Sequence, residues 1–192
     1  MNIEQIQQQI LAAKTIQIIG SGSQLKSHHA NSLDMSLHQG VVDYHPEELM
    51  LTVKAGTTIK HIEEILAVNN QALPFTVANT TIGGAYAMGG AELRDAVLGI
   101  KIVDGQGRIL NFGGQVMKNV AGYDVTRLLV GSKGQLAAIC EISFKVLPKA
   151  YITTPVLDLT SSAEAITTQQ SQLRLRIEQG LKHVFDPKAV FI

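Results

Sequence analysis

The sequence has no tryptophan, few aromatic side chains and no excess of charge of either sign. Aromatic residues make up 5% of the 192 residues, and 16 lysines and arginines balance 16 aspartates and glutamates. Nucleic-acid-binding proteins usually carry a basic excess that releases counterions from phosphates, and single-strand binders also stack bases on aromatic rings. We therefore expect no nucleic-acid partner.

Cysteine and long apolar runs are equally scarce. Cys140 is the only cysteine, so an internal disulfide is excluded and a reducing compartment fits. Glu4 and several glutamines stand where a secretory signal needs basic and then apolar residues. No run approaches the ~20 apolar residues of a membrane span. We expect a cytoplasmic protein without a span of its own, which could reach the inner membrane only through a complex.

Apolar residues nevertheless make up 45% of the chain, and their spacing in the first seventy residues predicts a small α/β lobe. Isoleucines at helical spacing predict helices over 3–11 and 58–69, the second capped by Thr57. Short apolar runs predict strands over 15–19 and 49–55.

A second lobe follows Pro74. Segments 97–103 and 108–112 flank an Asp-Gly-Gln-Gly turn, which predicts a β-hairpin. In 136–146 the even-numbered residues are apolar and the odd-numbered ones are polar from 141 onward, which predicts a half-buried strand. Between them, 124–130 reads as a short helix closed by a glycine.

The last forty residues differ in composition. Ser161 to Glu164 have the spacing of a capping box, which predicts a polar helix running towards His183. We therefore divide the chain into a first lobe at 1–72, a second lobe at 73–150 and a C-terminal tail at 151–192.

Two glycine-rich segments could contact an anion through their backbone. Gly20-Ser21-Gly22-Ser23 follows a predicted strand, but Leu25 stands where a dinucleotide fingerprint needs its third glycine. TTIGGA at 80–85 opens a predicted helix, whose free N–H groups would favour a diphosphate. A tight turn and a closely packed, capped helix explain these segments equally well, so neither decides the function.

A third segment is more specific. The sequence reads GGQVMKNVAGYD at 113–124 and GSKGQL at 131–136, and the following strand ends in KVLP at 145–148. Shorter stretches that belong with them occur earlier and in order: YHPEEL at 44–49, VKAG at 53–56 and RDAVLG at 94–99. In these stretches the chain resembles the FAD-binding subunits of glycolate oxidases, within the p-cresol methylhydroxylase (vanillyl-alcohol oxidase) flavoprotein superfamily. The resemblance covers residues 1–150.

This resemblance implies an α+β fold of two lobes, a PCMH-type FAD-binding domain with FAD held non-covalently between them. It further implies that the complete enzyme oxidises glycolate or a similar 2-hydroxy acid and passes electrons to a quinone or iron–sulfur partner. The residues implied in cofactor binding are Gly20, Ser21, Gly22, Ser23, Gln24, Thr81, Ile82, Gly83, Gly84, Gly134 and Ile139.

The chain departs from the family in two places. Only seven residues, 87–93, separate Tyr86 from Arg94, where the family has a longer loop that walls the flavin. About forty residues follow KVLP where the family has a cap domain, although 181–191 resembles the family's extreme C-terminus. We therefore name no catalytic residue, expect a subunit that is inactive alone, and expect other subunits or a second copy as partners.

Three functions remain open. The chain could bind FAD as a redox or structural subunit, or serve as a flavin-free scaffold, or bind nucleotides generally through 20–23. No metal site is expected, because the adjacent His28 and His29 cannot both ligate one ion and lack further ligands at helical spacing. Cys140 lies mid-strand on the apolar face, so we interpret it as a core residue rather than a nucleophile.

Overall fold

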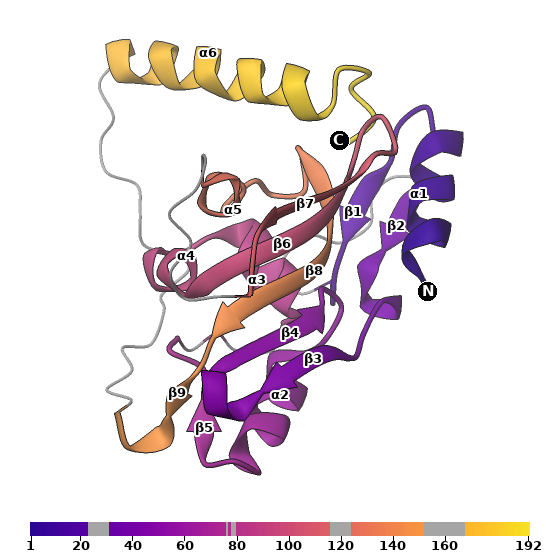
Figure 1. The fold of residues 1–192 in the computed structure, drawn as a ribbon. Helices are drawn as coiled ribbons and strands as arrows, with labels where there is room; N and C mark the ends of the chain where they lie inside the picture. The colour runs from indigo at the N-terminus through magenta and orange to yellow at the C-terminus, as the bar shows by residue number, and fades with distance from the viewer. Residues whose placement is uncertain (23–30, 76, 78–79, 116–123, 152–167) are drawn as a thin grey trace.

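The fold is that of a computed structural model, which describes residues 1–22, 31–75, 77, 80–115, 124–151 and 168–192 (Figure 1). The helices are α1 (Ile3–Ala12), α2 (Ile59–Ala67), α3 (Ile82–Met88), α4 (Ala91–Ala96), α5 (Val125–Leu128) and α6 (Thr168–Phe185), with 3₁₀ turns at Met35–Leu37, Pro46–Glu48 and Lys149–Tyr151. The strands are β1 (Gln17–Ile19), β2 (Ser32–Asp34), β3 (Val41–His45), β4 (Met50–Lys54), β5 (Gln71–Ala72), β6 (Val97–Asp104), β7 (Ile109–Gly113), β8 (Ala137–Lys145) and β9 (Leu147–Pro148).

A five-stranded antiparallel sheet forms the centre of the molecule, in the order β3-β4-β8-β6-β7. β1 and β2 pair in parallel beside it, and β5 pairs with β9. This confirms the predicted mixed α+β fold. In this sheet β3 and β4, which come before residue 72, pair with strands that come after residue 72. The predicted boundary between two lobes at residue 72 stays a prediction.

The predicted elements of the first seventy residues are confirmed, with one corrected helix cap. The N-cap of α2 is Thr58, whose Oγ1 accepts from the His61 N–H at 3.3 Å. Thr57, the predicted cap, is fully buried and donates its hydroxyl proton to the Lys54 carbonyl at 2.7 Å. Both threonines lie just before the helix, and only the tertiary contacts decide which of them turns back to cap it.

The predicted hairpin is formed by β6 and β7, and a buried carboxylate organises its turn. Asp104 accepts from the backbone N–H groups of Gln106 and Arg108 at 2.9 and 2.8 Å, and from Arg108 Nε at 2.7 Å. Gly107 has a φ of +75°, the left-handed conformation for which glycine has no steric cost. The fully buried Asp104 therefore fixes the reversal of the chain.

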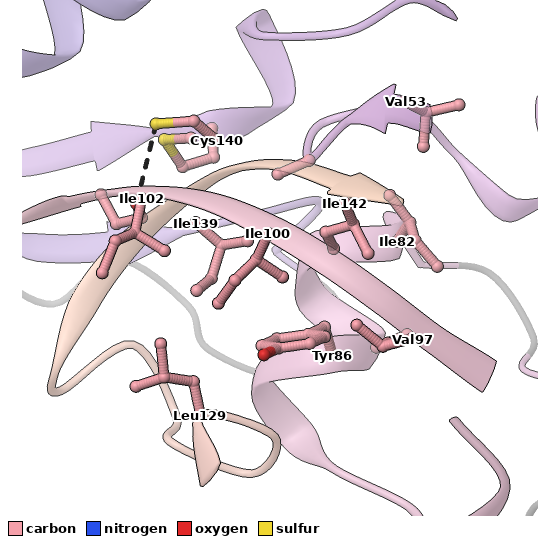
Figure 2. Close-up of a cluster of buried hydrophobic side chains, with 14 of the residues drawn as sticks. Val53, Ile82, Tyr86, Val97, Ile100, Ile102, Leu129, Ile139, Cys140 and Ile142 are labelled. Atoms are coloured by element: carbon pink, nitrogen blue, oxygen red, sulfur yellow. Dashed lines mark hydrogen bonds between the residues drawn. The ribbon is translucent and has the colours of Figure 1, made fainter. Parts of the chain in front are cut away.

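The main core lies between the sheet and α3. Ile82 and Tyr86 of α3 pack against apolar side chains of β6 and β8, such as Ile100 and Ile142 (Figure 2). The even-numbered face of β8 is buried as predicted. Ser143, predicted on the exposed face, is only 8% exposed, because its hydroxyl pairs with that of Thr52 on β4 at 2.8 Å.

The tail after α6 closes back on the N-terminal part of the chain. Phe191 forms a parallel bridge with Ile16, and the Gly105 N–H donates to the Phe185 carbonyl at 2.9 Å. The predicted polar helix towards His183 is α6, whereas the predicted capping box at 161–164 lies outside the described residues. Among the described helices, none combines the length and apolar character required to cross a membrane.

Candidate functional site

A small cavity brings together three segments that are far apart in the sequence. It measures about 50 Å³ and lies between the end of β1, the start of α3 and the start of β8. Six of the residues implied in cofactor binding line it: Gly20, Thr81, Gly83, Gly84, Gly134 and Ile139. The remaining lining residues are apolar and were not predicted as site residues: Ile18, Ile19, Met35, Ala55 and Ala137.

Four of the positions that line the cavity are glycines, and we call these four the glycine cradle: Gly20, Gly83, Gly84 and Gly134. A Cβ at Gly83 would lie 2.8 Å from the Ala55 Cβ, and one at Gly20 would lie 2.9 Å from Thr81 Oγ1. A Cβ at Gly84 would similarly meet Thr80 Oγ1 at 2.8 Å. The absence of a side chain at these positions therefore allows β1, α3 and their neighbours to pack closely around the cavity.

The start of α3 is built differently from the sequence expectation. The N–H groups of Ile82 and Gly83 donate to the carbonyls of Thr57 and Ala55 at 2.9 and 2.8 Å, and the Gly84 N–H donates to Thr81 Oγ1 at 3.1 Å. These amides are satisfied within the protein, so the argument from free N–H groups at a helix start does not apply to them.

The other implied residues do not line the cavity. Ile82 is 1% exposed and points into the core below the sheet (Figure 2). Ser21 and Gly22 lie exposed just beyond Gly20, and Ser23 and Gln24 lie outside the described residues. The apolar lining residues were missed because their pattern is that of ordinary core positions.

The cavity is small and its walls are uncharged, so it can hold only a narrow part of a larger ligand. A volume of about 50 Å³ is of the order of one or two water molecules, far below the ~300–1,000 Å³ of a complete ligand pocket. Its described lining residues carry no charged side chain. Thr81 is the only lining residue with a polar side chain, and the amides of Gly83 and Gly84 are already paired, so a ligand segment in this cavity would be held mainly by close packing.

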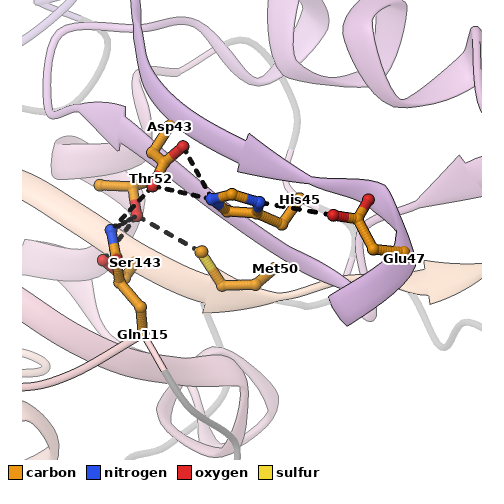
Figure 3. Close-up of polar contacts among 7 residues, drawn as sticks. All are labelled: Asp43, His45, Glu47, Met50, Thr52, Gln115 and Ser143. Atoms are coloured by element: carbon orange, nitrogen blue, oxygen red, sulfur yellow. Dashed lines mark hydrogen bonds and ion pairs between the residues drawn. The ribbon is translucent and has the colours of Figure 1, made fainter.

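A polar cluster on the sheet contains none of the implied site residues (Figure 3). His45 lies 3.1 Å from the Asp43 carboxylate, whose hydrogen bond raises the pKa of His45 above its ordinary value. Gln115 reaches Thr52 Oγ1 at 3.3 Å and so covers the Thr52–Ser143 hydroxyl pair. The buried hydroxyls of the cluster are thus paired, and His45 and Asp43 are accessible to solvent.

The buried ionisable side chains near α3 do not provide a nucleophile. Burial raises the pKa of Cys140 to about 12, which keeps the thiol protonated, and the interpretation of Cys140 as a core residue is confirmed. Burial also raises the pKa of Tyr86, whose hydroxyl donates to the Thr126 carbonyl. Within the described residues, no group of three or more histidine, cysteine, aspartate and glutamate side chains could hold a metal ion.

Comparison with known proteins gives a family match and several relatives. Residues 2–113 match the family described as FAD binding domain. The chain is 41% identical over 162 residues to glycolate oxidase subunit GlcE of Escherichia coli, covering 77% of this chain and 46% of that protein. It is 32% identical over 146 residues to glycolate oxidase subunit GlcD of Bacillus subtilis, covering 69% of this chain and 31% of that protein.

A third relative is a dehydrogenase. The chain is 30% identical over 138 residues to D-lactate dehydrogenase of Archaeoglobus fulgidus, covering 67% of this chain and 30% of that protein. The match to each of these three relatives spans less than half of the relative's length. The activities in the names of these relatives are therefore those of the complete proteins.

Proposed function

The chain belongs to the family of FAD binding domains, and from this premise we propose that it binds FAD non-covalently between its two lobes, as a subunit or domain of a glycolate oxidase-like 2-hydroxy-acid oxidoreductase. The observation that carries the proposal is the convergence of Gly20, Gly84 and Gly134 on one cavity. These glycines come from three stretches that the resemblance had independently implied in cofactor binding.

In this proposal the glycine cradle holds the narrowest part of FAD, its pyrophosphate bridge. The exposed Ser21 and Gly22, continuing into Ser23 and Gln24, would contact the cofactor where it leaves the cavity. Ile139 would pack against it from β8, and Ile82 would act indirectly by fixing α3 in the core. Bound FAD would supply the electron-transfer chemistry, while the protein positions it and excludes water.

The role within a larger assembly rests on the names of the relatives. Two of them are named as subunits of glycolate oxidase, and another as D-lactate dehydrogenase. From the names of the two glycolate oxidase subunits, we propose that the chain works with further subunits and is inactive alone. A cytoplasmic location and a second copy as a partner remain predictions from the sequence.

Reconstitution with FAD tests the proposal. The purified protein, incubated with excess FAD and desalted, should keep the visible absorbance band of a flavin. Gly20→Ala should weaken FAD binding by at least about tenfold, because its Cβ would lie 2.9 Å from Thr81 Oγ1, which lines the cavity and caps α3. Gly180→Ala on α6 is the matched control, since a Cβ there meets nothing within 4 Å, and it should leave FAD binding unchanged.

Two other results would replace the proposal. A folded protein that stays colourless after reconstitution would favour the flavin-free scaffold derived from the same fold. Retention of ADP as tightly as FAD, with loss of both in Gly20→Ala, would favour a general nucleotide site. Circular dichroism of both variants separates loss of binding from loss of fold.

A further inference from the structure

α6 carries an apolar stripe that faces solvent. Leu173, Ile177 and Val184 are 60%, 54% and 60% exposed, and Gly180 between them has open space beside it. These four residues, which we call the α6 stripe, are spaced by four, three and four positions. That is the a/d spacing by which one helix packs against another along a seam.

The stripe lies to one side of the contacts that hold α6 in place. Phe185 and Leu181 point towards the body of the protein, and Lys182 Nζ donates to the carbonyls of Gln135 and Phe191 at 2.6 and 2.7 Å. A groove of about 840 Å³ separates the rest of α6 from residues 128–136, and Leu175 lines it. At 100° per residue, Leu175 and the stripe lie on opposite flanks of the helix.

The first part of α6 has little packing of its own. Every described side chain from Gln172 to Gly180 is exposed, and Figure 1 shows the helix running along one end of the molecule. Helices in proteins gain most of their stability from burying an apolar face rather than from intrinsic propensity. A hollow of about 330 Å³ beside Leu173 and Ile177 leaves room for side chains of another helix.

The charged residues beside the α6 stripe indicate which charge a helix packed on the stripe would carry. The four positions that flank an a/d seam here are Arg174, Arg176, Leu181 and His183, and none is acidic. Glu178, the single acidic residue of α6, is already paired with Arg174 at 2.7 Å. Arg176 forms no ion pair with any described residue. A second copy of α6 would set basic side chains against basic or neutral ones in either orientation, which disfavours self-association.

We propose that the α6 stripe is a docking surface for an acidic amphipathic helix of another polypeptide. Leucine or isoleucine side chains of that helix would pack between Leu173, Ile177 and Val184, and the small Gly180 would allow close approach. A glutamate beside its apolar seam would face Arg176, because Arg174 is already paired with Glu178. The α6 stripe contains none of the residues of the proposed FAD site, and the experiment below uses no flavin, so the two proposals can fail separately.

Two synthetic helical peptides provide the probe. Both carry isoleucine and leucine at a and d, and one has glutamate and the other lysine at every e and g. Fluorescence anisotropy should show that the purified protein binds the glutamate peptide about tenfold more tightly than the lysine peptide, and less tightly at high salt. Arg176→Glu should weaken binding of the glutamate peptide about two- to fivefold and strengthen that of the lysine peptide.

A matched pair of variants locates the surface. Ile177→Ser should weaken binding of the glutamate peptide about tenfold, since it removes an apolar side chain from the seam. Leu175→Ser, which is equally exposed on the opposite flank, should change it less than about twofold. Equal binding of the two peptides, no binding by the folded protein, or equal effects of the two variants would overturn the proposal. So would sedimentation showing a dimer of this chain that Ile177→Ser dissociates.

Discussion

The glycine cradle and α6 use the same residue type under opposite constraints. At Gly83 in α3, an added Cβ would meet both the Cβ and the carbonyl oxygen of Ala55, at 2.8 and 2.9 Å. At Gly180 in α6, it would meet nothing within 4 Å. The first glycine is required by what surrounds it. The second is not required by any neighbouring atom of the described structure and lowers the helix propensity of α6.

The two regions also differ in whether charged side chains hold them in place. The cradle is walled by uncharged residues, and the amides at the start of α3 are satisfied by nearby backbone and side-chain oxygens. The end of α6 is instead fixed by an ion pair between the partly exposed Lys182 and the buried Asp186, in which Lys182 Nζ lies 2.7 Å from Asp186 Oδ2. Local packing thus holds the glycine cradle, whereas Asp186 holds the end of α6. Substitutions can therefore test the two regions separately.

The largest effect is expected from Asp186→Ala. The Asp186 side chain is fully buried and accepts from the N–H groups of Val190 and Phe191 at 2.8 and 2.9 Å, besides Lys182. Its loss leaves a partly buried cation and two amides without their acceptor, and should lower the free energy of unfolding by about 3 kcal/mol. Urea denaturation measures this, and hydrogen exchange should increase at residues 185–192 while β8 stays protected.

Glu178→Ala is the matched control for this prediction. It removes the other ion pair of α6, with Arg174, in which both side chains are more than half exposed. Exposed pairs contribute little, so the unfolding free energy should change by less than about 0.5 kcal/mol. Similar losses in the two variants would mean that the helix, rather than its buried anchor, limits stability.

The second effect tests the two glycines directly. Gly83→Ala forces a Cβ into Ala55 and should destabilise the protein by about 1–2 kcal/mol, because the contact involves backbone that cannot move aside. Gly180→Ala introduces the same methyl group into open space and should stabilise α6 by about 0.5–1 kcal/mol. Thermal unfolding should therefore shift in opposite directions, and shifts of the same sign would contradict the comparison.

The sequence predicted the two regions unequally, for physical reasons. α1, α2 and β8 follow from apolar periodicity and the hairpin from its Asp-Gly-Gln-Gly turn, and the resemblance pointed to the three glycine stretches that the structure brings to one cavity. Periodicity could not show that Thr58 rather than Thr57 caps α2, or that Ser143 is buried against Thr52, because tertiary partners decide both. Nor could it show that Asp186 anchors the tail, since its partners depend on how the tail folds back.

The smallest effect concerns His38, a buried histidine between the 3₁₀ turn Met35–Leu37 and β3. His38 is 1% exposed, its Nδ1 lies 2.8 Å from the Met1 carbonyl oxygen, and its Nε2 is buried without a partner among the described residues. Burial is the main cause that lowers the pKa of His38 below its ordinary value of 6.5, and nearby Lys54 acts in the same direction. The carbonyl of Met1 and the carboxylate of Glu141 oppose this shift.

Above pH 6.5, His38 is neutral in both the folded and the unfolded chain and adds no pH dependence. As the pH falls from 6.5 towards the lower folded-state pKa, the unfolded chain takes up a proton that the folded chain does not, so stability decreases by at most about 1.4 kcal/mol per pH unit. His38→Asn, which keeps a short donor towards Met1, should flatten this slope in urea titrations. His183→Asn on the exposed surface of α6 is the control, and equal slopes in the two variants would remove His38 as the source. His45 shifts stability the other way, because the hydrogen bond to Asp43 raises its pKa, but it is present in both variants and cancels.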